Sequence, residues 1–127
     1  MSNYLTRISV ALASVAFSLS PLATLSGQVS PTTPQTIVGE VTDSMCAPSK
    51  SHSGMMATMP NMGHDASSCA KECAKIGAKY VLLDNQTGKV YQVDDQAKIA
   101  EFAGHRVKVT GTLTARGIKV ANINAIG

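Results

Sequence analysis

Residues 79–113 read KYVLLDNQTGKVYQVDDQAKIAEFAGHRVKVTGTL, and the order of the elements that they predict decides the fold. Two segments, 79–84 and 89–93, are rich in β-branched and aromatic side chains and flank a turn-forming Asn-Gln-Thr-Gly, which predicts a β-hairpin. The acidic pair that follows can cap a helix that ends at Gly104. The clean alternation from residue 106 onward then predicts a further strand.

The flanking sequence adds a strand on each side of this stretch. Residues 36–42 place Ile37, Gly39 and Val41 on one face, and residues 118–123 form a last strand after a turn. The order is therefore strand, strand, strand, helix, strand, strand, which is the order of the OB-fold. We expect a mainly β, five-stranded OB-like barrel with a helix between strands three and four, and another small barrel or a sandwich is the alternative.

Residues 44–77 then form a long loop between strands one and two, and this loop concentrates the reactive side chains. It contains all three cysteines, two of the three histidines and five of the six methionines. Residues 48–63 have no periodicity and are rich in Gly, Pro and Ser, which predicts loop. Residues 70–76 predict a short helix, capped by Ser67 or Ser68 and ended by a glycine, on which the last two cysteines share a face.

Thiol, thioether and imidazole groups are the protein ligands that soft and borderline metals prefer. Methionines recur every three residues in this loop, with a histidine on each side, so the loop can wrap a metal ion. Copper is the preferred metal and zinc the second choice. The alternative is that the methionines only make adaptable apolar contacts. The candidate metal ligands are His52, Met56, Met59, Met62, His64, Cys69 and Cys73.

The three cysteines also allow a disulfide, because the chain has the features of an exported protein. The candidates are Cys46, Cys69 and Cys73, and a bridge from Cys46 to either of the others closes a loop worth on the order of 3 kcal/mol. One thiol is then left over for a metal, for a partner chain or for redox sensing. Three free thiols that bind one metal are the competing arrangement.

The N-terminus predicts export. Arg7 precedes a short apolar run, which small and polar residues follow, so residues 1–27 read as a secretory signal peptide. Residues 28–35 read as a Pro/Thr linker and residues 36–127 as the folded domain. We expect a periplasmic or secreted protein with no stable membrane anchor after cleavage.

Composition and motifs exclude several function classes. A formal net charge of +3 without a basic stripe argues against nucleic-acid binding. The chain has no nucleophile elbow, phosphate-binding loop or zinc-protease helix, so we expect no enzyme and assign no catalytic residue. The expected partner is a metal ion or an exported protein.

Four short motifs stand out in the chain: Gly-x-Val-x-Asp-x-x-Cys at 39–46, Cys-x-x-x-Cys at 69–73 after a histidine, Gly-Ala-Lys-Tyr-Val-Leu at 77–82, and Ala-Gly-x-x-Val-x-Val-Thr-Gly at 103–111. They resemble those of a family of small exported bacterial proteins of unknown function with an OB-like domain. The likeness covers most of residues 37–126 and implies an exported location, but it supplies no activity.

The sequence thus predicts an exported β-barrel protein that binds copper for sequestration or delivery. The alternative is a disulfide-stapled OB-like module that binds a protein, peptide or sugar partner and no metal.

Overall fold

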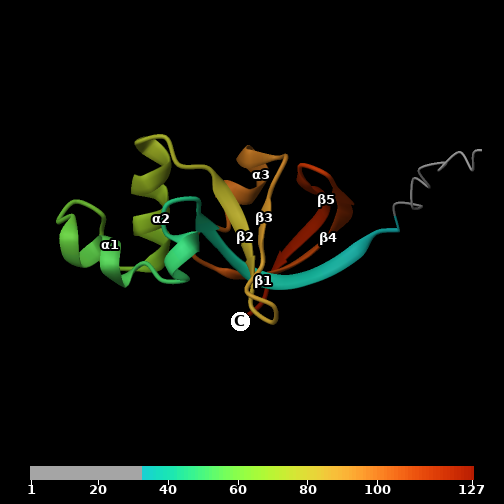
Figure 1. Cartoon of the computed structure of the whole chain (residues 1–127), viewed down its shortest axis with the longest axis horizontal. Coiled ribbons are helices and arrows are strands. Elements are labelled where there is room, and N and C mark those ends of the chain that lie inside the picture. Colours follow the sequence, from blue (N-terminus) through green and yellow to red (C-terminus); the bar gives the residue numbers. More distant parts are fainter. Residues whose placement is uncertain (1–32) are drawn as a thin grey trace, which may run out of the picture.

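The computed structural model describes residues 33–127, which form a five-stranded antiparallel sheet and several short helices (Figure 1). The signal peptide predicted for residues 1–27 lies outside these residues, and so does most of the predicted linker, whose last residue already belongs to the first strand. In chain order the elements are β1 (Gln35–Asp43), the 3-10 helix η1 (Ala47–Ser49), α1 (Ser53–Thr58), α2 (Ala66–Lys75), β2 (Tyr80–Asp84), β3 (Val90–Gln92), α3 (Gln96–Ala100), β4 (Arg106–Thr114) and β5 (Gly117–Ala125).

All five strands lie within two residues of their predicted bounds, and α3 lies between β3 and β4 as expected. Asp95 caps α3, since its side chain accepts a hydrogen bond from the backbone N–H of Lys98 at 3.0 Å. The mainly β class and the element order are therefore confirmed.

The sheet is not closed into a barrel, because the strands form an open sheet in the order β3-β2-β1-β4-β5. Closure would require a ladder between the two edge strands, β3 and β5. Within residues 33–127, the pairing between these edges is an isolated parallel bridge between Val93 and Ile118 and not a ladder. β3 is three residues long, too short to offer β5 a continuous row of hydrogen-bonding groups.

The sheet has an apolar core on one face, drawn from alternating positions as the sequence pattern predicts. Ile37 and Val41 of β1 pack with Val107 and Val109 of β4, and Leu82 of β2 is fully buried among them. Burying aliphatic side chains of this size contributes about 1.5–3 kcal/mol each, so the sheet has its own source of stability.

The segment between β1 and β2 is not mainly loop, which corrects the prediction for residues 48–63. It contains η1 and α1 as well as α2, and Figure 1 shows α1 and α2 at the end of the molecule where β1 finishes. Pro48 fits the start of η1, and α1 is only six residues long, so a helix this short depends on its neighbours for stability. We call residues 44–77 the insert.

Within residues 33–127, no helix is both long enough and apolar enough to cross a membrane.

Candidate metal centre

The end of β1 positions the first ligand-type side chains. Asp43 is fully buried, and its Oδ1 accepts hydrogen bonds from the backbone N–H of Met45 at 2.9 Å and of Cys46 at 3.0 Å. Such a turn, closed by an aspartate side chain, reverses the chain directly after a strand. It holds Cys46 close to the strand that it follows.

His52 returns to the same strand end from the start of α1. Its ring is 6% exposed, and Nε2 lies 3.1 Å from Thr42 Oγ1 and 3.5 Å from Glu40 Oε1. Its other nitrogen, Nδ1, lies 3.7 Å from Asp43 Oδ2. The ring is therefore fixed against β1 rather than directed at solvent.

The remaining two cysteines come from α2. Asp65 and Ser68 form a capping box at its start, in which the Asp65 side chain accepts from the Ser68 N–H at 2.8 Å. Gly104, with φ of +76°, lets the chain before β4 approach the backbone of Ser67, where a Cβ atom would collide. These contacts fix the helix so that Cys69 and Cys73, one turn apart, face the end of β1.

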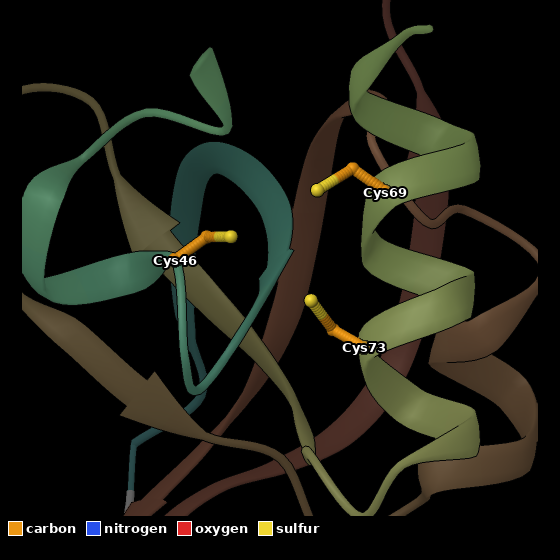
Figure 2. Close-up of side chains that lie close together, drawn as sticks. All are labelled: Cys46, Cys69 and Cys73. Atoms are coloured by element: carbon orange, nitrogen blue, oxygen red, sulfur yellow. The ribbon is translucent and has the colours of Figure 1, made fainter. Parts of the chain in front are cut away.

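The three thiols converge. Figure 2 shows the Cys46 side chain directed at the face of α2 that carries Cys69 and Cys73. The three Sγ atoms lie within 4.8 Å of one another, and all three cysteines are free and at most 2% exposed. We call this set the thiol triad. A disulfide would need two of these sulfurs to approach to about 2.05 Å, so the predicted bridge stays a prediction.

A second donor group shares one residue with the thiol triad. Asp43, Cys46 and His52 also place one ligand atom each within 4.8 Å of the others, and all three are buried. We call this set the mixed triad. Within residues 33–127, Asp43 Oδ2 and His52 Nδ1 have no hydrogen-bond partner, since the 3.7 Å between them is too long for a hydrogen bond. A buried polar atom left unpaired costs about 1–3 kcal/mol, and both atoms are available to a metal ion.

The methionines divide into two groups. Met62 is buried, with Sδ 3.9 Å from Cys73 Sγ, so it adds a thioether beside the thiol triad. Met55 and Met56 pack against the sulfur cluster while half-buried. Met59 is 40% exposed, which removes it from the predicted ligand set in this conformation. The reason is α1, which replaces the expected flexible loop and turns successive methionines in different directions.

His64 is the other predicted ligand that the structure does not bring in. It is exposed, it belongs to neither donor group, and its backbone N–H donates to Ser68 Oγ at 3.2 Å. It lies just before α2, so the start of the helix sets its position. Of the seven predicted metal ligands, the structure gathers His52, Met62, Cys69 and Cys73, and Met56 packs half-buried against the sulfur cluster.

Asp43 is the ligand-type residue that the sequence did not predict, although it stands in the quoted Gly-x-Val-x-Asp-x-x-Cys motif. A single aspartate at a strand end usually reads as a turn residue, which it also is. Its distance of three residues from Cys46 in a tight turn was the available indication.

Burial and charge favour the protonated form of two of the thiols, those of Cys46 and Cys73. Burial, and then the charge of Asp43, raise the pKa of Cys73 to about 11. The same two causes raise the pKa of Cys46 further. Thiols of this kind are poor nucleophiles at neutral pH, which argues against a reactive catalytic cysteine. A metal ion can still bind them by displacing their protons.

The donor chemistry fits a soft or borderline metal ion. Thiolate, thioether and imidazole groups converge in a buried space, and two of the surrounding polar atoms have no hydrogen-bond partner within residues 33–127.

Comparison of the chain with models of protein families, with curated proteins and with solved structures finds no match.

Proposed function

We propose that this protein is an exported metal-binding protein whose thiol triad holds a soft metal ion, Cu(I) in preference to Zn²⁺. The observation that carries the proposal is the convergence of three buried sulfurs from two separate parts of the insert. Two neighbouring cysteines would be enough for a disulfide. Here the side chains of all three cysteines are directed toward one another, which a disulfide does not require.

The surrounding donors favour copper. Soft thiolate and thioether ligands select Cu(I), whereas harder ions bind thioethers poorly. The nearest further sulfur is Met62 Sδ, 3.9 Å from Cys73 Sγ, and two half-buried methionines cover the cluster. Zn²⁺ accepts three cysteines as well, so it remains the competing metal.

The proposed role is sequestration or delivery. Catalytic metal sites keep an open coordination position for substrate, whereas the thiol triad is at most 2% exposed. Burial shields the ion from solvent and oxidants, which suits a protein that stores or carries it. We propose no catalytic activity.

Export rests on the N-terminal sequence, and the proposed compartment is the periplasm or the exterior. We further propose that the sheet is an incomplete OB-like barrel. The element order and the parallel bridge between Val93 and Ile118, at the edge where such a barrel would close, support this. The insert then lies in a loop that OB-folds use for ligands.

The test is a Cu(I) titration of the reduced exported chain without oxygen, in competition with a chromogenic Cu(I) chelator. We expect about one Cu(I) held by the thiol triad of the wild-type chain. The double variant C69S/C73S should bind Cu(I) at least about 100-fold more weakly, because a single thiolate is left. Far-UV circular dichroism checks that the variant keeps the sheet.

His64→Gln and Met59→Leu are the matched controls, since both residues lie in the insert but outside the thiol triad. Both should leave Cu(I) affinity unchanged. Mass spectrometry after alkylation counts free thiols in the protein as isolated. A metal-free protein with a disulfide, which after reduction still fails to compete for Cu(I), would contradict the proposal and favour the partner-binding alternative.

A further inference from the structure

We propose that the mixed triad of Asp43, Cys46 and His52 is a second metal position, for a borderline divalent cation such as Zn²⁺. The thiolate of Cys46 would bridge this cation to the Cu(I) in the thiol triad. The bridge rests on the proposed function, whereas the second position itself rests on atoms outside the thiol triad.

The first observation is the state of Asp43. Its carboxylate is fully buried, and its two hydrogen bonds, from the backbone N–H groups of the turn, both go to Oδ1. Within residues 33–127, Oδ2 accepts no hydrogen bond and lies 3.7 Å from His52 Nδ1. A turn residue needs one oxygen only, so the turn does not explain why a second charged oxygen is enclosed here.

The second observation is the orientation of His52. Thr42 Oγ1 lies 3.1 Å and Glu40 Oε1 3.5 Å from Nε2, whereas the carboxylate at Nδ1, Asp43 Oδ2, is more distant at 3.7 Å. Because the closer oxygens lie at Nε2, we place the ring proton there. Nδ1 then offers a lone pair toward Asp43 and Cys46, and it has no other partner. A histidine that binds a metal through one ring nitrogen usually donates the N–H of its other ring nitrogen to an oxygen, which fixes the tautomer.

The third observation is the position of Cys46. It belongs to both donor groups, and the two groups share no other residue. One set is all sulfur, and the other offers oxygen, nitrogen and sulfur. Soft Cu(I) favours the first set, and Zn²⁺ accepts all three donor types of the second.

Charge balance supports a second cation. With the thiols deprotonated, three thiolates and the Asp43 carboxylate lie together in a buried space. One Cu(I) offsets a single negative charge of these four. Buried charges need compensation, and a divalent ion at the mixed triad would offset two of the three negative charges that remain.

The experiment loads the reduced full chain with Cu(I), adds Zn²⁺, removes unbound metal and measures both metals by mass spectrometry. We expect about one zinc ion per chain in addition to the copper. Asp43→Asn should lose the zinc and keep the copper. This variant removes the charge and one oxygen without removing the turn, because its remaining side-chain oxygen can still accept the two turn hydrogen bonds.

Further variants separate the two positions. His52→Gln should also lose zinc and keep copper, and His64→Gln should behave as the wild type. C69S/C73S should lose copper and retain zinc. Cys46→Ser tests whether the thiolate is shared. It should weaken the binding of both metals by about tenfold or more.

Spectroscopy gives a second readout. Co²⁺ in place of Zn²⁺ should show thiolate-to-cobalt charge transfer in C69S/C73S, where Cys46 is the only one of the three thiols left. The triple variant C46S/C69S/C73S should lose this band. A wild-type chain that binds copper but no zinc overturns the second position and leaves the proposed function standing. Zinc retained by Asp43→Asn also overturns it. A chain that binds neither metal overturns both.

Discussion

The sheet and the insert are built on different principles. The core of the sheet is aliphatic, with Val41, Leu82 and Val107 fully buried across three strands. The buried cluster that the insert forms with the adjacent Ala78 contains three cysteines, a methionine and that alanine, and no branched aliphatic side chain. A core of branched aliphatic side chains stabilises a fold by itself, whereas thiols contribute far more when a metal binds them. The sheet is therefore the scaffold, and under the proposed function the insert gains much of its stability from the metal ion.

The largest effect should come from the sheet. Leu82→Ala removes a fully buried side chain from the centre of the apolar core, and we expect a loss of about 3 kcal/mol in the free energy of unfolding. Urea unfolding followed by circular dichroism measures it. Val90→Ala, at an exposed position of β3, is the control and should change stability little. Equal losses in the two variants would contradict an apolar core on this face.

The second prediction concerns the metal. At a free Cu(I) concentration of 100 times Kd, binding should stabilise the chain by about 2.7 kcal/mol. We expect metal binding to slow amide hydrogen exchange most in α2, which supplies two thiols. Amides of β4 and β5 that exchange through local opening should slow least. C69S/C73S should show no such protection. Uniform slowing across the sheet and the insert would break the distinction between them.

The same division separates what the sequence predicted from what it did not. Apolar alternation and the hairpin pattern around a turn predicted the five strands, and helical spacing placed Cys69 and Cys73 on one face. These are local patterns. The open sheet, by contrast, depends on how far β3 extends, and the entry of Asp43 and the loss of His64 depend on tertiary contacts of the insert. No periodicity encodes which of several polar side chains in a segment turns inward.

The third prediction is a pH dependence of the metal-free protein. Burial raises the pKa of Cys73 from 9.0 to about 11, so the folded state holds this proton more tightly than the unfolded state. The resulting stability is fully present below pH 9 and is lost as pH rises toward 11. Cys46 has the same sign. We expect urea midpoints to fall across this window, and less steeply in Cys73→Ser.

Tyr80 requires a control, because burial and the charge of Asp43 raise its pKa as well. Tyr80→Phe removes the tyrosine contribution and should leave most of the fall in place. Cu(I) should abolish the thiol contribution, since the metal has already displaced the protons. A metal-free protein whose stability stays flat between pH 9 and 11 would contradict buried protonated thiols.

The smallest effect tests whether the sheet is independent of the metal. Thr87 Oγ1 donates to Asp84 Oδ2 at 2.7 Å in the β2–β3 turn, and this bond is the main cause of the lowered pKa of Asp84. Thr87→Ala should cost about 1 kcal/mol at neutral pH. The Asp84 contribution, present above the ordinary carboxyl pKa and lost as pH falls through the lowered one, should shrink. Since this turn lies in the sheet, the cost should be equal with and without Cu(I), and a metal-dependent cost would show that the insert and the sheet stabilise each other.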